Sequence, residues 1–271
     1  MTGDSLFLDW LPQWLLDLAQ KHGAVIASPN YRLMPEATTQ DVYTDVEDFW
    51  SWLHSSAAAN LLLQHKTELD LTRILTAGES AGGLLSIALS LSHPEQIRAC
   101  TAAYPCVDLM SDHFTTAKET PLMGIFMPES AVTDHVAQIV PGAIESSAFP
   151  PVRLDLMLGA IQNGQFIELY ERGTGGADRV LRYPFEKLDQ KDVKIPTGGI
   201  AIIHGKQDDI VPPEGSERFV AKARGATQGR PGGDKIVLTT QEGGHGFDGM
   251  TELKEGWLLD TLKSAVDAWL E

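Results

Sequence analysis

Apolar residues recur along much of the chain with the spacing of a helix. Over residues 8–21, 41–55 and 256–270 they return every three or four positions, which predicts amphipathic helices with one buried face. Residues 81–92 are almost entirely apolar, so the helix expected there should be covered on several sides. Gly23 directly follows the first of these segments and is expected to end its helix.

Short apolar runs between these helices predict buried strands. They cover residues 24–31, 73–78, 98–105, 198–205 and 235–240. Strands that alternate with helices along a chain build parallel sheets covered on both faces. We therefore expect an α/β fold with a mostly parallel sheet and helices on both of its faces.

The stretch 108–192 interrupts this alternation. Proline and glycine recur in it, its apolar patches are short, and no strand pattern is visible. A structureless loop of that length is improbable inside a domain, so we expect a cap or lid insertion. The core of the domain would then consist of residues 1–107 and 193–271.

Charge narrows the class of partner. The 271 residues include 37 Asp and Glu against 21 Lys and Arg, which gives a formal net charge of −16. A field of that sign repels phosphate backbones and anionic lipid, so we expect neither nucleic acid nor a membrane surface as a partner. The longest uncharged stretch, residues 80–94, is shorter than the ~18 residues that a membrane-spanning helix needs, so no membrane span is expected.

Targeting signals and cysteine use favour a cytoplasmic location. The first ten residues contain two acidic and no basic side chains, unlike a signal peptide. Cys100 and Cys106 flank the end of a predicted strand, too far apart along it for a disulfide. Both are interpreted as small buried apolar residues.

A candidate nucleophile lies between a predicted strand and a predicted helix. Residues Gly78-Glu79-Ser80-Ala81-Gly82 fit the pattern G-x-S-x-G. In that setting a tight turn, too close for a side chain at either glycine, lifts the serine hydroxyl out of the carboxyl end of the sheet. The Ala81 N–H and the positive end of the helix would then face a developing oxyanion. Ser80 is the predicted nucleophile, and an ordinary N-cap serine is the alternative.

His245 is the predicted general base. It lies in the run GGHGFD, directly after the last predicted strand, where flanking glycines would let a loop present the imidazole. The expected chain order for such a triad is serine, acid and then histidine. The remaining histidines fit less well because they flank the serine on predicted helices, lie in the insertion or end a strand. They are His22, His54, His65, His93, His113, His135 and His204.

The acid is expected after the strand 198–205, where two candidates are adjacent. Asp208 fills the acid position of the pattern H-G-x-x-D-x-x-V-P. Asp209 would more naturally cap a helix that begins near Pro213. Asp208 is therefore the favoured acid, and Asp209 stays open as the alternative.

Three blocks of this sequence resemble the hormone-sensitive-lipase-like carboxylesterases, the α/β-hydrolase fold-3 family. Residues 28–36, SPNYRLMPE, resemble the family's Y-R-L-A-P-E block; GESAGG resembles its serine turn; GGHGFD resembles its histidine loop. The resemblance covers essentially the whole chain. It implies hydrolysis of a small-molecule carboxylic ester through an acyl-enzyme, with no cofactor and no metal. It carries Ser80, Asp208 and His245 over as the triad.

Two features depart from the family pattern. The acid is followed by Asp-Ile-Val-Pro-Pro rather than the common Pro-Leu, which keeps the choice of acid open. The family's H-G-G-G loop, expected just before a segment like Thr2-Gly3-Asp4-Ser5, is absent from the chain as given. We expect an N-terminally incomplete hydrolase of low activity, in which strands 24–31 and 73–78 either pair directly or leave the chain marginally stable.

The insertion indicates a class of substrate. Its long apolar side chains would suit an apolar acyl or aryl ester, unless they form the core of the cap itself. They are Met110, Met123, Phe126, Met127, Phe149, Leu154, Leu156 and Met157. The competing functions are a thioester or lactone hydrolase of secondary metabolism and a non-catalytic remnant with an incomplete oxyanion hole.

Overall fold

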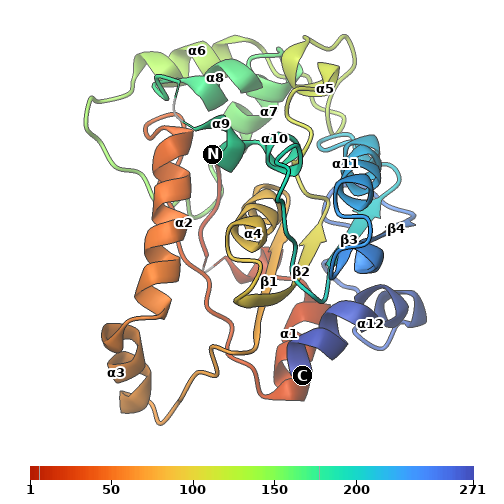
Figure 1. Cartoon of the computed structure of the whole chain (residues 1–271). Coiled ribbons are helices and arrows are strands. Elements are labelled where there is room, and N and C mark those ends of the chain that lie inside the picture. The colour runs from red at the N-terminus through yellow and green to blue at the C-terminus, as the bar shows by residue number, and fades with distance from the viewer. Residues whose placement is uncertain (6, 177) are drawn as a thin grey trace.

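A parallel sheet forms the centre of the molecule in the computed structural model, which describes residues 1–5, 7–176 and 178–271 (Figure 1). The strands are adjacent in chain order, β1-β2-β3-β4, and every neighbouring pair is parallel. They span Ile74–Glu79, Ile97–Ala103, Ile200–Gly205 and Val237–Gln241. The predicted α/β fold with a parallel sheet is confirmed, and four of the five predicted strands are present.

Helices cover both faces of this sheet. The α4 helix (Ala81–Ser92) packs on β1 and β2, and α11 (Pro213–Ala226) packs on β3 and β4. The opposite face is covered by α1 (Gln13–His22) and α12 (Gly256–Leu270). The α2 helix (Thr39–Leu53) lies outside α4 and continues into α3 (Ser56–Gln64), which the apolar pattern did not predict. Among the described residues, no helix is long and apolar enough to cross a bilayer.

The residues of β3 show why the sheet separates two cores. Ile200 and Ile202 point into the core shared with α4 and α11, whereas Ala201 and Ile203 point into the core shared with α1 and α12. All four side chains are buried. Side chains alternate between the two faces of a strand, so a strand buried on both faces reads as the continuous apolar run seen in the sequence.

Local signals explain where the first helices begin and end. The predicted helix over 8–21 divides into a short 3-10 turn, Leu8–Trp10, and α1, because the extended backbone of Pro12 separates them. Gly23 ends α1 in the left-handed region at φ 63°, as expected. The α2 helix begins with a capping box, in which the side chains of Thr38 and Asp41 each bond the other's backbone N–H.

The predicted strand over residues 24–31 is wrong. The segment has no regular structure and does not pair with β1, whose outer edge is therefore unpaired within the described chain. A groove of about 580 Å³ separates the two, lined by residues of both. An apolar run becomes a strand only where its backbone finds a partner, and this one does not, so direct pairing of 24–31 with β1 does not occur.

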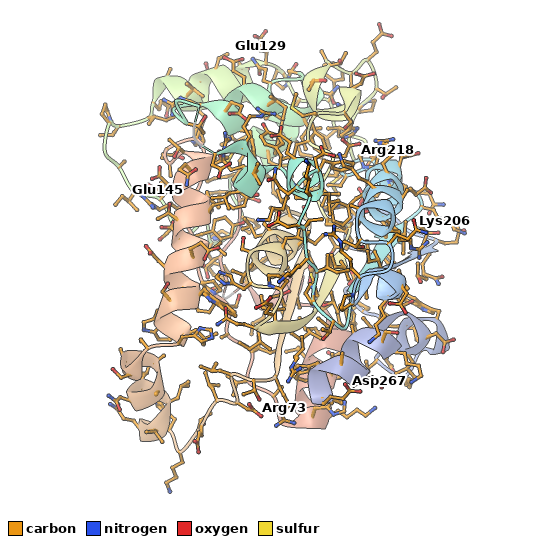
Figure 2. The ribbon with its side chains drawn as sticks, in the orientation of Figure 1. Arg73, Glu129, Glu145, Lys206, Arg218 and Asp267 are labelled. Carbon is orange, nitrogen blue, oxygen red and sulfur yellow. The ribbon has the colours of Figure 1, made fainter. Side chains whose placement is uncertain are left out.

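The insertion 108–192 folds as a helical layer at the carboxyl ends of the strands. Its helices are α5 (Asp112–Thr115), α6 (Ser130–Ala137), α7 (Leu154–Gln162), α8 (Phe166–Glu171), α9 (Arg179–Arg182) and α10 (Pro184–Leu188). Figure 2 shows Glu129 in this layer at the opposite end of the molecule from Arg73, which precedes β1. The layer thus lies on the side of the sheet at which β1 ends in Glu79.

A buried arginine joins this helical layer to the core. Arg182 is fully buried; its guanidinium pairs with Glu171 (3.1 Å) and donates to the hydroxyl of Thr39 on α2 (3.2 Å). The hydroxyls of Tyr43 and Tyr170 donate to the carbonyl of Arg182. A buried charge is tolerated only when it is paired and hydrogen-bonded, so this contact fixes α9 against α2.

The two arginines of α9 give a matched test of the contact between α9 and α2. We expect Arg182→Ala to lower the free energy of unfolding by about 3 kcal/mol, since it empties a fully buried site and removes the bonds to Thr39 and Glu171. Arg179→Ala removes an arginine that also pairs with Glu171 but is 42% exposed, and should cost under about 1 kcal/mol. Urea denaturation of both variants measures the difference. Equal losses would contradict the role of burial.

Candidate active site

The turn between β1 and α4 holds Ser80 in a strained conformation. β1 ends at Glu79 and α4 begins at Ala81, so Ser80 is the single residue between strand and helix. Its φ of 51° and ψ of −116° are rare for a residue with a side chain. Its N–H donates to the carbonyl of Ala103 (3.0 Å), and its carbonyl accepts from the N–H of Cys106 (3.2 Å). The end of β2 therefore holds this turn in place.

The glycines of the turn have different roles. A Cβ on Gly78 would lie 2.3 Å from the carbonyl oxygen of Gly82, so the strand and the helix approach too closely for any side chain there. A Cβ on Gly82 would meet nothing within 4 Å, so the expectation that both glycines of the motif exclude a side chain is wrong for Gly82. A Cβ on Gly83 would lie 3.0 Å from Pro105, where α4 packs closely on the chain after β2.

The loops after β3 and β4 bring Asp208 and His245 together. The Nδ1–H of His245 donates to Oδ2 of Asp208 at 2.8 Å. That bond fixes the tautomer in which Nε2 carries no proton and can accept one. Gly243, at φ 136°, shapes the loop that carries the imidazole, and a Cβ there would lie 2.6 Å from Phe247.

The carboxylate of Asp208 is buried and fully engaged. Its Oδ1 accepts from the N–H groups of Ile210 (3.0 Å) and Val211 (2.9 Å). Burial alone would raise the pKa of Asp208, but hydrogen bonds from His204 and His245 hold that pKa well below its usual range. Asp208 is therefore ionised at every pH at which the protein is expected to work.

His204 supports Asp208, although the sequence analysis set it aside because it ends a predicted strand. It is fully buried at the end of β3, with its Nε2 at 2.7 Å from the carbonyl of Val211 and 3.4 Å from Asp208 Oδ2. Its Nδ1 lies 2.9 Å from the hydroxyl of Ser216. Its position after an apolar run was visible in the sequence, but its contact with Asp208 was not.

Asp209 points away from His245, toward the helical layer. Its Oδ2 accepts from the N–H of Met123 at 2.7 Å. Met123 and Gly124, both at positive φ, form the tip of a tight turn closed by reciprocal bonds between Leu122 and Ile125. The two adjacent aspartates thus point in different directions, with Asp208 on the histidine and Asp209 on the insertion.

Ser80 and His245 are not hydrogen-bonded to each other in the described chain. Among the described residues, a hydrogen-bond partner is found for Nδ1 of His245 but not for Nε2, which leaves Nε2 available to a serine hydroxyl. Hydrogen bonds of this kind often tighten only when substrate binds. Ala81 is the first residue of α4, so its N–H has no partner within the helix.

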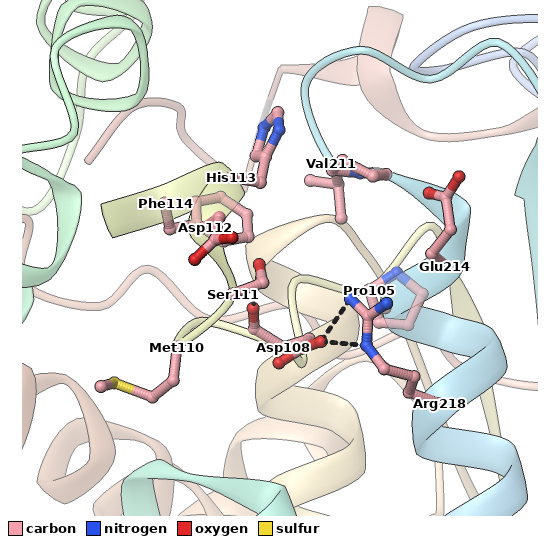
Figure 3. Close-up of a pocket in the computed structure, with 12 residues that line it drawn as sticks. Pro105, Asp108, Met110, Ser111, Asp112, His113, Phe114, Val211, Glu214 and Arg218 are labelled. Carbon is pink, nitrogen blue, oxygen red and sulfur yellow. Dashed lines mark hydrogen bonds and ion pairs between the residues drawn. The ribbon is translucent and has the colours of Figure 1, made fainter. Parts of the chain in front are cut away.

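A cavity of about 470 Å³ lies between α5 and the start of α11, beside the loop that follows β3 and carries Asp208 (Figure 3). Arg218 of α11 pairs with Asp108 across its floor, with the closest atoms 2.6 Å apart. Met110 and His113 line it from the insertion, and His113 Nε2–H donates to the carbonyl of Ile210 (2.9 Å). Burial and the nearby Lys118 lower the pKa of His113 to about 4, so it is neutral at pH 7.

The long apolar side chains of the insertion fall into two groups. Leu156 is buried, and Met127 and Met157 pack partly against the core that the insertion shares with the sheet. The others are exposed: Met110, Met123, Phe126, Phe149 and Leu154. The residues that the structure describes contain no cluster of three His, Cys, Asp or Glu side chains placed to hold a metal ion.

The sequence is similar to those of known proteins. The sequence profile of the alpha/beta hydrolase fold-3 family matches residues 5–155. The probable carboxylesterase M8 of Phoma sp. is 29% identical over 270 residues, covering 95% of this chain and 79% of that protein. The probable carboxylesterase clz11 of Cochliobolus lunatus is 32% identical over 213 residues, covering 74% and 93%. The non-reducing polyketide synthase Preu6 of Preussia isomera is 28% identical over 273 residues, covering 91% of this chain and 12% of the synthase.

Solved structures show the same fold at low sequence identity. A protein of unknown function from Staphylococcus aureus superposes on this chain with a TM-score of 0.63 at 18% identity, over 100% of this chain and 85% of that one. At that identity the likeness establishes the fold alone.

The two glycines of the serine turn provide a test of the close approach. Gly78→Ala should lower the free energy of unfolding by about 3 kcal/mol, because the added methyl group would collide with the backbone of Gly82. Gly82→Ala should leave stability within about 0.5 kcal/mol, since open space surrounds that position. Thermal or urea unfolding measures both. A tolerated alanine at position 78 would show that the turn can open.

Proposed function

The chain belongs to the alpha/beta hydrolase fold-3 family, and we propose that it is a carboxylesterase that cleaves its substrate through an acyl-enzyme on Ser80. The observation that carries the proposal is the bond between Asp208 and His245, at the same edge of the sheet as the strained serine turn. Strained backbone at a serine beside a carboxylate-bound imidazole is typical of a nucleophile and its base.

The proposed reaction would use the side chains of Ser80, His245 and Asp208. His245 Nε2 accepts the proton of Ser80 as its oxygen attacks the acyl carbon, and the imidazolium then donates that proton to the leaving alcohol. A water molecule, deprotonated by the same nitrogen, releases the acid. Asp208, ionised and held by backbone N–H groups, stabilises the imidazolium in each step.

Stabilisation of the oxyanion would come first from the N-terminus of α4. The Ala81 N–H lies beside the nucleophile and has no partner within the helix, and the positive end of the α4 dipole adds to its field. Each donor to an oxyanion typically contributes ~10²–10³ in kcat. Ala81 is therefore the proposed first donor of the oxyanion hole.

The insertion is proposed as a lid that selects the acyl or aryl group. Its tight turn at Met123 is bonded to Asp209, the neighbour of the catalytic acid, and it exposes apolar side chains beside that contact. Flexible, exposed Met and Phe side chains suit apolar groups of varied shape. Apolar acyl or aryl esters are the proposed substrates.

A second candidate is a thioester or lactone hydrolase. The observation that favours it is the similarity of this chain to a segment of a non-reducing polyketide synthase. The triad chemistry is the same for oxygen and sulfur leaving groups, so substrate profiling separates the two.

Separate substitution of the two adjacent aspartates by asparagine tests the proposed triad. Hydrolysis of p-nitrophenyl acetate, butyrate, octanoate and decanoate gives the activity, and Ser80→Ala gives the background. We expect Asp208→Asn to reduce kcat by about 10⁴-fold because the wrong imidazole tautomer is favoured. Asp209→Asn, which keeps an oxygen acceptor for Met123, should retain most activity. Rates of Ser80→Ala equal to those of the parent would refute the proposal, and a reversed aspartate pattern would move the acid to Asp209.

The lid proposal predicts a change in chain-length preference. Replacing Met123 and Phe126 together by alanine should raise KM for octanoate and decanoate esters several-fold while acetate hydrolysis changes little, since only long chains would reach these side chains. The matched control is Val140→Ala with Ile144→Ala, two exposed apolar residues elsewhere in the insertion. An equal effect of both double variants would rule out a specific role for the turn.

A further inference from the structure

The loop after β4 that carries His245 is rich in glycine. Gly243, Gly244 and Gly246 lie within two residues of the histidine, and glycine backbones have more conformational freedom than any others. The bond between His245 and Asp208 joins two side chains and does not by itself fix the backbone of the loop. The imidazole can therefore keep one position only if other contacts hold this loop at both of its ends.

The far end of the loop is held by α1. The indole N–H of Trp14 donates to Oδ2 of the fully buried Asp248 at 2.8 Å. The N–H of Gln13 donates to the carbonyl of Gly249 at 3.1 Å. This end is buried and hydrogen-bonded to the core, so the freedom that remains in the loop lies at its near end, before the histidine.

Gln207, in the loop after β3, holds the near end. It directly precedes Asp208, and its partner Gly243 lies two residues before His245. The backbone N–H of Gln207 donates to the carbonyl of Gly243 at 2.9 Å, and the side-chain Oε1 of Gln207 accepts from the Gly243 N–H at 2.6 Å. One residue thus bonds both backbone polar groups of a glycine in the neighbouring loop.

Glu242 fixes the orientation of the Gln207 amide. Nε2 of Gln207 donates to Oε2 of Glu242 at 2.7 Å, and Oε1 of Glu242 accepts from the ammonium of Lys206 at 2.5 Å. An ionised carboxylate only accepts hydrogen bonds, so the amide turns its N–H groups toward Glu242. Its oxygen is thereby directed to the N–H of Gly243.

This contact continues the pairing of β3 with β4 beyond the ends of both strands. Gly205 and Gln241 are the last paired residues of the two strands. A Cβ on Gly205 would lie 2.4 Å from the carbonyl oxygen of Gly243, so the two loops run close together. Asp208 and His245 follow the contact by one and two residues. A shift at the contact would therefore displace the carboxylate relative to the imidazole.

We propose that Gln207 is a positioning residue, which fixes the imidazole of His245 against Asp208 by holding the backbone of Gly243. This role rests on the proposed function. Gln207 acts through the loop and not on the substrate. Without its side chain the Gly243 N–H would bond water, and the loop after β4 would occupy several positions. A displacement of about 1 Å can cost ~10² in rate.

Truncation of Gln207 tests the role in ester hydrolysis. Gln207→Ala should lower kcat for p-nitrophenyl butyrate by about 10- to 100-fold and change KM by less than about threefold, because a displaced base slows the chemical step and not binding. The matched control is Lys206→Ala, the adjacent exposed residue, whose side chain bonds Glu242. Its kcat should stay within about twofold of the parent. Equal kcat for the two variants would overturn the positioning role.

Two variants of similar side-chain length separate the acceptor from mere bulk. Gln207→Met keeps the reach of the side chain but removes the amide, so it should lose kcat as Gln207→Ala does. Gln207→Glu combined with Glu242→Gln keeps an acceptor for the Gly243 N–H without placing two carboxylates together. It should retain kcat within about threefold. Full activity of Gln207→Met, or loss in the double variant, would contradict the role of the acceptor.

Proton NMR reports on the imidazole without any substrate. The Nδ1–H of His245, bonded to Asp208, should give a low-field resonance that His245→Gln removes. In Gln207→Ala the resonance should broaden or disappear, since a mobile loop opens this bond to exchange with water. In Lys206→Ala it should stay sharp. A sharp, unshifted resonance in Gln207→Ala would overturn the role.

The outcomes distinguish this role from the proposed function. Gln207 is exposed, so the variants at positions 206 and 207 should melt within about 3 °C of the parent, and a lower kcat then reflects position and not unfolding. A parent without hydrolysis, with a resonance that Gln207→Ala removes, would refute the esterase and support the positioning of the imidazole. Hydrolysis that Ser80→Ala abolishes, with kcat and the resonance unchanged in Gln207→Ala, would overturn the positioning role alone.

Discussion

The buried carboxylate of Asp208 is the interaction on which the site depends. A charge taken out of water must be satisfied by hydrogen bonds, and Asp208 finds them in two backbone N–H groups of its own loop and in His245. Those bonds join the loop after β3 to the loop after β4. His204 also holds the loop after β3, because its imidazole bonds the carbonyl of Val211.

The parallel sheet supplies the geometry that this carboxylate uses. In a parallel sheet all carboxyl ends lie at one edge, so the loops after β1, β3 and β4 reach the same place. The serine turn is held there by bonds to Ala103 and Cys106 at the end of β2, and these bonds offset the strain at Ser80. Backbone contacts at the end of β2 thus orient Ser80, which lies in the turn after β1.

The helical insertion is joined to the core by a buried arginine and by a single backbone bond to Asp209. Arg182 is buried between α9 and α2, whereas the turn at Met123 is joined to the acid loop by one bond to Asp209. Three exposed apolar side chains of the insertion, Met123, Ile125 and Phe126, lie at the second of these contacts.

The residues by themselves determined the elements whose signal is local. The apolar runs identified β1 to β4, and the strand-turn-helix setting of G-x-S-x-G identified the serine turn, because side-chain period and glycine spacing act over a few residues. The pattern over 24–31 failed because a strand also requires a partner at its edge. Sequence spacing favoured Asp208 over Asp209, but the spacing alone did not show that Asp208 is the one that bonds His245.

Only the tertiary structure revealed what depends on contacts between distant segments. Tyr104 bonds Glu79 and packs against the ring of His245, and Trp14 bonds Asp248, although these residues come from separate parts of the chain. No periodicity or motif connects them, because hydrogen bonds across a sheet edge leave no spacing in the sequence. The same is true of the contact between His204 and Asp208 and of the bond from Arg182 to Thr39 on α2. These partners depend on the fold, because a buried polar group is stable only when it is hydrogen-bonded.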